Sequence, residues 1–321
     1  GVNVEALLNT CVSKFKFSRV LDFCFSACKT LPHSIGKLKH LRYFCIENNH
    51  NIKRLPNSIC NLQNLQSLKL TGCNELEALP KGLRKLISLR QLEITTKQPV
   101  LPYNEITNLS LLSIESSCNL ESIFGGMKFP TLKTFRVVDY QSLKSLQLVV
   151  KNLPELETLV VGFCFNLDLE LCKDHHKKQS DKLKLKHVHL SALPQLVSFP
   201  QWLQVTINSL QSLHISFCHN LVILPEWLST VTHLKVLFIL DCPKLLYLPD
   251  NLTAPESLTI KDRPELCRKY QRNVGEHWSK ISHIKEAIIG DQRSLDIRDE
   301  KERNDRDYYG MYDKHISFIV N

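Results

Sequence analysis

The sequence predicts a solenoid in which one short unit is stacked many times, and three observations support this. An apolar pattern, leucine-x-x-leucine-x-leucine, recurs along nearly the whole chain of 321 residues. Its copies follow one another at nearly constant intervals. The composition is that of a globular protein, since 43% of the residues are hydrophobic and 23% are charged, which leaves enough apolar surface for a core.

The intervals between the copies identify the type of repeat. Clear copies are LQSLKL at 65–70 and LKVLFI at 234–239. Neighbouring copies are at least 20 residues apart (Leu92 to Leu112) and at most 29 (Leu159 to Val188). This range is the period of leucine-rich repeats. The sequence therefore predicts about eleven repeats, each marked by the fourth residue of its copy: Leu21, Phe44, Leu68, Leu92, Leu112, Phe135, Leu159, Val188, Leu213, Leu237 and Leu258.

Each copy has the alternation of a short strand with one buried face, as in Leu68 and Leu70. One unit cannot bury this face alone, so neighbouring units stack. The predicted fold is an α/β-type leucine-rich-repeat solenoid. A curved parallel sheet forms its concave side, and irregular, 3-10 or short helical segments form its convex side. Four phenylalanines are expected in the core: Phe44, Phe124, Phe135 and Phe199.

The pattern divides the chain into four parts. Residues 1–16 are a lead-in from a truncated upstream region, and residues 17–263 form the horseshoe. Residues 264–290 form a carboxy-terminal cap, and residues 291–321 are a charged tail that we expect to be disordered. A polar insertion at 173–182 falls in the longest interval and is expected to project as a loop.

Five cysteines occupy places that the repeat explains. Cys73, Cys164, Cys218 and Cys242 lie three residues after the last apolar strand position, and Cys118 lies four after it. A small thiol fits this inward position, where it meets backbone groups of the turn. Stacked parallel neighbours have poor disulfide geometry, so we expect reduced thiols and a cytoplasmic protein.

Alternate strand residues face the concave side and are the candidates for binding a protein partner. At 235–240, the side chains of Val236, Phe238 and Leu240 would be exposed apolar neighbours on this surface, and such patches mark contact surfaces. In LKHVHL, two histidines lie on or beside the same face. The candidate partner-binding residues are Arg42, Lys69, Glu93, Arg136, His187, His189, His214, Val236, Phe238 and Leu240.

Other function classes are disfavoured. The net charge of +9 is spread singly along the chain, so no nucleic-acid partner is expected. No apolar run approaches the ~18 residues of a membrane span. The segment with Cys172, His175 and His176 has metal-ligand residue types but no second ligand pair, so we predict a solvated loop and no metal site. No cysteine has a nucleophile signature around it, and a horseshoe offers no closed cleft, so no catalytic residue and no enzyme activity are predicted.

Several sequence segments within the repeats resemble the repeat sequences of one family. RVLDF at 19–23, LPHSIGKLKHLRYF at 31–44 and LHISFCHNLVILPEWL at 213–228 are similar to repeats of plant intracellular disease-resistance receptors of the coiled-coil, nucleotide-binding class. GEHWSKISHI at 275–284 resembles the end of that region, and the resemblance covers roughly residues 10–290. It implies a non-enzymatic recognition and autoinhibitory domain of innate immunity. Its implied partners are the receptor's own nucleotide-binding domain and a pathogen effector or a guarded host protein.

The family's phosphate-binding loop has no match, since Gly36 and Lys37 are followed by Leu38. No cofactor is therefore expected in this chain, and ADP or ATP would bind only in a nucleotide-binding domain outside it. The resemblance implies a cytoplasmic location, with the nucleus or a membrane surface as further locations of the full receptor. One alternative stays open, because LPxSIGxLxxL words also occur in stand-alone intracellular leucine-rich scaffolds that bind a signalling protein such as a small GTPase.

Overall fold

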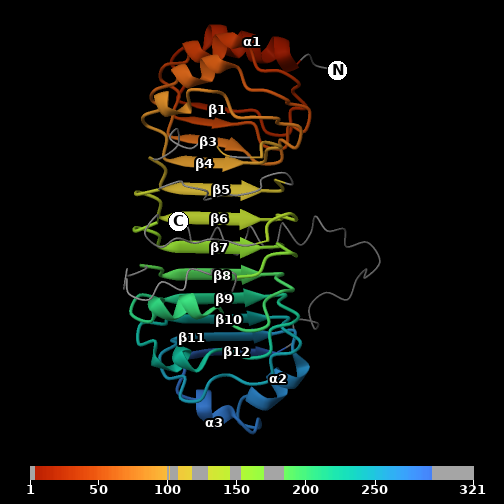
Figure 1. Cartoon of the computed structure of the whole chain (residues 1–321), viewed down its shortest axis with the longest axis vertical. Coiled ribbons are helices and arrows are strands. Elements are labelled where there is room, and N and C mark those ends of the chain that lie inside the picture. Colours follow the sequence, from red (N-terminus) through yellow and green to blue (C-terminus); the bar gives the residue numbers. More distant parts are fainter. Residues whose placement is uncertain are drawn as a thin grey trace.

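The computed structural model describes residues 4–99, 101, 108–117, 129–144, 153–169 and 184–290. Within these ranges, twelve strands form one sheet, and each pairs in parallel with the next strand along the chain (Figure 1). The predicted solenoid with a parallel sheet is confirmed. The strands are β1 (Val20–Asp22), β2 (Tyr43–Cys45), β3 (Ser67–Leu70), β4 (Gln91–Ile94), β5 (Leu111–Glu115), β6 (Thr134–Val138), β7 (Thr158–Gly162), β8 (His187–Ser191), β9 (Ser212–Ser216), β10 (Val236–Leu240), β11 (Ser257–Lys261) and β12 (Glu286–Gly290).

The pairing brings the marker residues of successive repeats side by side. Leu213, for example, is the register partner of both Val188 and Leu237. These side chains are fully buried and belong to one continuous core that runs the length of the stack. The predicted core aromatics Phe44, Phe135 and Phe199 are also buried, whereas Phe124 lies outside the described residues.

The inward cysteines satisfy backbone carbonyls, as the repeat predicts. The thiols of Cys73, Cys164, Cys218 and Cys242 are buried and lie 3.2–3.8 Å from carbonyl oxygens of the same or the preceding turn. Asn49 occupies the same place in its repeat, and its amide donates to the carbonyls of Phe23 and Ile46. Hydrogen bonds of this kind stabilise a buried turn, because an unsatisfied backbone group there is costly.

A residue with a left-handed backbone follows the strand in most repeats. It lies four residues after the marker residue, with φ from 45° at Asp241 to 75° at Gly72. Its N–H group donates to the next repeat: Ala192 to Ser216 and Phe217 to Leu240, both at 2.9 Å. The chain therefore turns without interrupting the ladder. The residues in this position are Phe25, Asn48, Gly72, Ser116, Asp139, Phe163, Ala192, Phe217, Asp241 and Asp262.

Proline positions the short helices opposite the sheet. Four of them follow Pro32, Pro56, Pro200 or Pro225, whose carbonyl accepts the first bond of each 3-10 turn. Proline fixes φ near this geometry and needs no donor at a helix start. The irregular, 3-10 convex side is thus confirmed. Its helices are η1 (His33–Lys37), η2 (Asn57–Asn61), η3 (Leu83–Lys85), η5 (Gln201–Thr206) and η6 (Glu226–Thr230).

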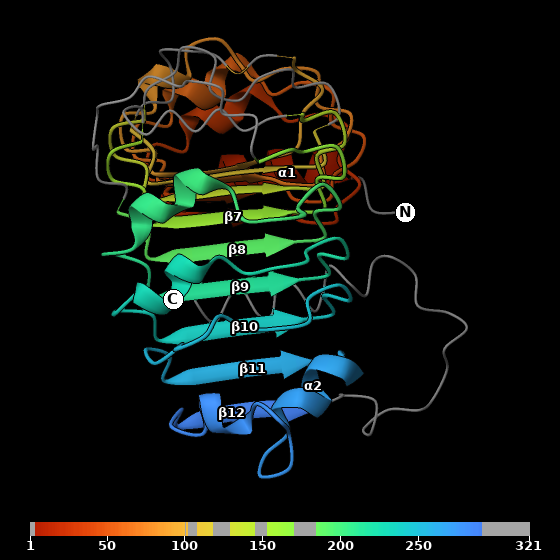
Figure 2. The ribbon, with the colours of Figure 1, turned by 60° about the horizontal axis from the view of Figure 1, so that its bottom comes forward.

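Both ends of the stack carry α-helices. Part of the expected lead-in forms α1 (Val4–Lys14), which buries Leu8 and Val12 against the first repeat. At the other end, the segment expected as a cap contains α2 (Pro264–Tyr270), α3 (Trp278–Ile281) and β12 (Figure 2). The sheet thus extends one strand into that segment. Residues 291–321 and the insertion at 173–182 lie outside the described residues. No helix in the described part is long and apolar enough to cross a membrane.

Replacing Leu213 by Ala should lower the free energy of unfolding by about 2–5 kcal/mol, because the removed atoms leave a cavity between two packed repeats. The exposed Thr232→Ala change is the control and should stay within about 0.5 kcal/mol of wild type. Urea unfolding followed by circular dichroism measures both. Equal stabilities for the two variants would contradict the placement of Leu213 in the core.

Truncation after Arg263 should make the protein aggregate, because it uncovers Leu258 and Ile260 and leaves the edge of β11 unpaired. Truncation after Gly290 keeps α2, α3 and β12 and should leave a monomer. Multi-angle light scattering distinguishes the two. A monomeric protein ending at Arg263 would mean that the segment 264–290 is not needed to cover the core.

Candidate functional site

The concave face carries, from each strand, the side chain that directly follows the marker position, and these side chains form what we call the central column. Its members are register partners from one strand to the next, so they follow one another along the whole sheet. Neighbours in the column are therefore neighbours in space. From β1 to β12 they are Asp22, Cys45, Lys69, Glu93, Ser113, Arg136, Val160, His189, His214, Phe238, Thr259 and Ile288.

Three aromatic rings of the central column form a stack on β8, β9 and β10. The rings of His189 and His214 are 4.3 Å apart at 20°, and those of His214 and Phe238 are 5.3 Å apart at 21°. We call these three side chains the aromatic stack. Val160 precedes it in the column, while Val236 and Leu240 flank Phe238 on β10. The result is a continuous uncharged strip over four repeats.

Burial favours the neutral form of two histidines here, His189 in the strip and His187 beside it. His189 is 6% exposed. Desolvation, and then the neighbouring His214 and His187, hold its pKa well below the usual value. Burial, and then Lys186, also lower the pKa of His187, although Glu157 opposes them. Imidazole and phenyl rings can pack against apolar surfaces, so the partly exposed His214 and Phe238 are suited to contact with an aromatic or aliphatic partner.

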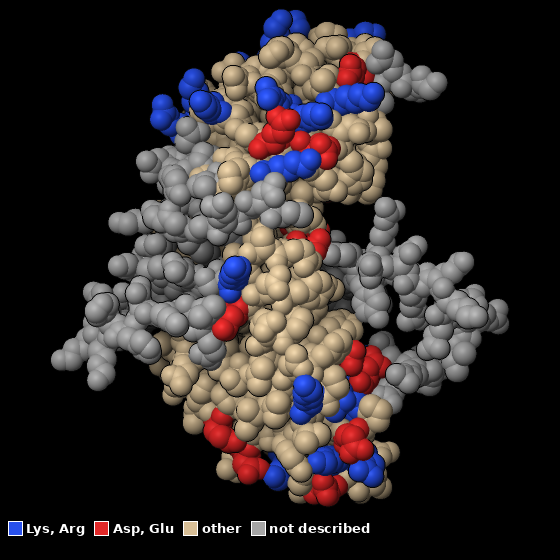
Figure 3. All heavy atoms as spheres, turned by 45° about the vertical axis from the view of Figure 1, so that its right-hand side comes forward, with Lys and Arg blue, Asp and Glu red and all other residues tan. Residues whose placement is uncertain are grey.

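The column is charged on the strands before Val160. Lys69 pairs with Glu93 at 3.0 Å, and Arg136 approaches Glu115 at 4.0 Å. We call these four side chains the charged segment. Burial works against a charged Lys69, but Glu93 outweighs it, so the pKa of Lys69 is raised. Figure 3 shows acidic and basic side chains gathered toward both ends of the molecule, with a mainly uncharged surface between them.

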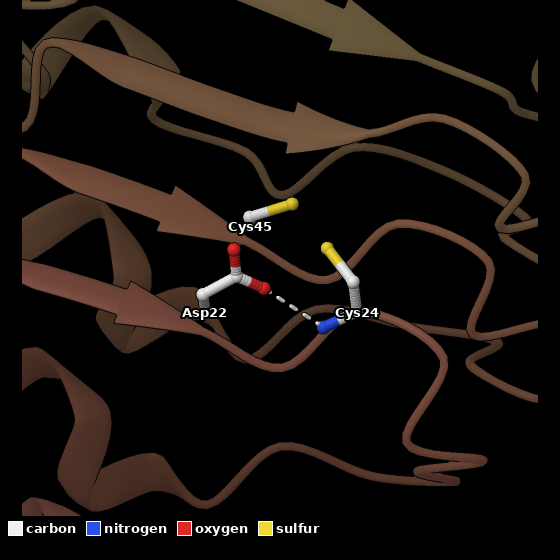
Figure 4. Close-up of side chains that lie close together, drawn as sticks. All are labelled: Asp22, Cys24 and Cys45. Carbon is white, nitrogen blue, oxygen red and sulfur yellow. Dashed lines mark hydrogen bonds between the residues drawn. The ribbon is translucent and has the colours of Figure 1, made fainter.

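Asp22, Cys24 and Cys45 form a further cluster in the first two repeats (Figure 4). One donor atom from each lies within 4.8 Å of the others. The backbone N–H of Cys24 donates to Asp22 Oδ1 at 3.1 Å, and the Cys24 sulfur lies 4.0 Å from Glu47 Oε2. We call these residues, with Glu47, the thiol–carboxylate cluster. Burial raises the pKa of both thiols and of the Glu47 carboxyl.

The structure therefore sorts the ten residues suggested by the sequence. His189, His214 and Phe238 come together in the aromatic stack, with His187, Val236 and Leu240 beside it, and Lys69, Glu93 and Arg136 lie in the charged segment. Arg42 differs, because it is exposed and precedes β2, where its carbonyl accepts from Gln66 and Ser67. Cys45, not Arg42, is the register partner of Lys69.

Sequence reasoning missed the thiol–carboxylate cluster. Cys24 lies beyond the end of β1, where the repeat motif specifies nothing, and its partners are 21 and 23 residues away. A signal was nevertheless present: Asp22 and Cys45 each directly follow the marker residue of their repeat, so they occupy equivalent places in neighbouring strands. The segment with Cys172, His175 and His176 lies outside the described residues.

Lowering the pH from about 7.5 to about 5.5 should destabilise the protein, partly through His189. Its lowered pKa means that the unfolded chain binds more protons once the pH falls below about 6.5. Stability is then lost by up to about 1.4 kcal/mol per pH unit until the folded pKa is reached. Urea unfolding at both pH values should show a smaller loss in His189→Gln than in wild type or in the exposed control His233→Gln. Identical losses in all three proteins would count against this reasoning.

Several solved structures are similar to this chain at low sequence identity. Among solved structures, the leucine-rich repeat domain of the type III effector XopL has a TM-score of 0.48 at 16% identity, covering 88% of this chain and 80% of that one. The plant peptide hormone receptor RGFR1, solved with RGF2, has a TM-score of 0.42 at 18% identity over 74% of this chain and 44% of that one. The internalin InlF of Listeria monocytogenes has a TM-score of 0.37 at 13% identity, covering 88% and 92%.

The family itself is identified from the sequence. No curated protein matches the chain. A family model described as a leucine-rich repeat region matches residues 3–242, which are 240 of the 321 residues. The chain therefore belongs to the leucine-rich repeat family of protein-interaction domains.

Proposed function

We propose that this chain is the recognition and autoinhibitory domain of a plant disease-resistance receptor of the coiled-coil, nucleotide-binding, leucine-rich-repeat class. The resemblance of the words at 31–44, 213–228 and 275–284 supports this specific assignment. In this proposal the chain carries no catalytic residue and no cofactor. Exchange of ADP for ATP takes place in a nucleotide-binding domain elsewhere in the receptor.

The observation that carries a binding role is the uncharged strip around the aromatic stack. It leaves the rings of His214 and Phe238 partly exposed, with Val236 and Leu240 beside them, while His189 is buried at one end of the stack. Aromatic side chains provide a large contact area with little conformational freedom to lose, and they often dominate the energy of protein interfaces. A protein partner fits this composition better than nucleic acid, which would need clustered Lys and Arg.

The charged segment offers a second kind of contact on the same face. Its paired Lys69 and Glu93, and Arg136 near Glu115, favour partners with complementary charges and specify orientation more than affinity. In the proposed receptor, one part of the face holds the nucleotide-binding domain inactive while another binds the effector or guarded protein. Such a switch requires that the effector bind the open state better than the closed one.

A stand-alone scaffold that binds a small GTPase remains the second candidate. The words at 31–44 also occur in scaffolds of that kind. The coding sequence upstream of residue 1 distinguishes the two functions. A GxxxxGK[ST] module there supports the receptor, and an open reading frame without one supports the scaffold.

Phe238→Ser and His214→Ala should alter effector-dependent cell death, or raise spontaneous cell death, when placed in the full-length protein. Both change the uncharged strip while keeping the inward leucines, so protein abundance should match wild type. Transient expression in leaf tissue, scored with and without effector and checked by immunoblot, measures this. Thr232→Ala, which is exposed outside the strands, is the matched control.

If both variants accumulate normally and respond like wild type, the strip is not the recognition surface. A loss of response together with a loss of protein would instead indicate a folding defect. The isolated domains, compared by circular dichroism, separate this case from a defect in binding.

A further inference from the structure

We propose that the thiol–carboxylate cluster of Asp22, Cys24, Cys45 and Glu47 is a binding site for a thiophilic divalent cation, with Zn²⁺ as the expected ion. The cluster lies at the carboxyl ends of β1 and β2 on the concave face (Figure 4). It is separate from the aromatic stack, and the inference does not depend on the proposed receptor function.

The backbone holds the four donor groups together before any ion binds. Asp22 and Cys45 are register partners on neighbouring strands, which are about 4.8 Å apart in a sheet. The ladder then continues on both sides of Cys24, because Phe23 donates to Cys45 and Phe25 donates to Glu47, both at 2.9 Å. Cys24 is therefore fixed beside the chain that carries Cys45 and Glu47.

The donor set and its dimensions suit zinc. Zn²⁺ accepts both cysteine thiolates and Asp or Glu carboxylates as ligands, and two of each supply the four that its tetrahedral coordination needs. With Zn–S bonds of about 2.3 Å, two thiolates in a tetrahedron lie about 3.8 Å apart. The three donor atoms of Asp22, Cys24 and Cys45 already lie within 4.8 Å of one another, so rotation of side chains can close the site. Mg²⁺ and Ca²⁺ prefer sets made only of oxygen ligands.

The charged groups around the cluster favour binding of a cation, and binding of a cation releases protons from the thiols. The carboxylates of Asp22, Glu47 and Glu93 surround the site, whereas Lys69 is the cation beside them and pairs with Glu93 at 3.0 Å. The Tyr43 phenol lies beside Cys45 and Asp22. Each thiol that binds the ion releases one proton to solvent, so affinity should rise with pH.

The site would join the first two strands of the stack. β1 has three residues and pairs with β2 alone, which makes it a short edge strand among the described strands. A metal bridge from Asp22 and Cys24 to Cys45 and Glu47 connects the two repeats through side chains as well as backbone. Because a ligand that binds only the folded state stabilises it, zinc should raise the unfolding temperature.

The test uses the whole chain, reduced, freed of metal with a chelator and titrated with Co²⁺ and then Zn²⁺. We expect thiolate-to-cobalt charge-transfer absorption that saturates at about one equivalent and is abolished by Zn²⁺. Cys24→Ser, Cys45→Ser and Asp22→Asn should each weaken metal binding by at least about 10–100-fold. Loss of a side chain that only hydrogen-bonds to a ligand already has an effect of this size. Cys11→Ser in α1 and Cys172→Ser, in the segment with metal-ligand residue types, are the controls and should bind like wild type.

Circular dichroism of the metal-free variants establishes that they fold. If Cys45→Ser is unfolded, the half-buried Cys24 and the exposed Asp22 still carry the test through their own variants. The proposal is overturned if no charge-transfer absorption develops, or if it persists in Cys24→Ser and Asp22→Asn. It is also overturned if the absorption disappears in Cys172→Ser. A third contrary outcome is that the reduced protein binds neither Co²⁺ nor Zn²⁺ and that air oxidation only yields a Cys24–Cys45 disulfide.

Discussion

The parallel hydrogen-bond register between successive strands is the constraint on which the rest of the structure depends. It places equivalent positions of all repeats side by side, both toward the core and toward the concave face. Toward the core this produces a continuous column of buried leucines, which is what makes a single repeat stable. Toward solvent it produces the central column, where a property shared by neighbouring repeats becomes a property of the surface.

The concave face consequently changes character along the stack. The first two repeats contribute thiols and carboxylates, the next four contribute mainly charged or polar side chains, and β7 to β10 contribute valine, histidine and phenylalanine. In a solenoid each repeat contacts only its neighbours, so these segments can bind different partners with little direct coupling.

Most of the fold could be predicted from the sequence because the period and the alternation are physical requirements of stacking. Leu68, Leu213 and Phe135 are buried for the reason that the pattern indicates. The outward direction of His189 and Phe238 also follows from alternation, but their ring stacking does not. It requires the register across β8 to β10 and the ring orientations, which only the folded sheet supplies.

The structure of segments that lack the repeat motif could not be predicted from the sequence. α1 buries Leu8 and Val12, but its 11 residues give too short a helical pattern to predict a helix that packs on the first repeat. β12 has the sequence EAIIG and lacks the leucine pattern, so its pairing with β11 depends on the existing sheet edge. Cys24 belongs to the same category, because only tertiary structure brings it to Cys45.

The left-handed residue after the strands has a consequence for how such a protein diverges. An L-residue with this backbone has a steric cost of about 1–2 kcal/mol, yet phenylalanine, serine, alanine and aspartate all occupy the position. The bond to the next repeat holds the conformation, so the side chain does not have to favour it. Along this rim the neighbours specify the shape of each turn, which leaves the identity of the rim residue open to selection for other properties.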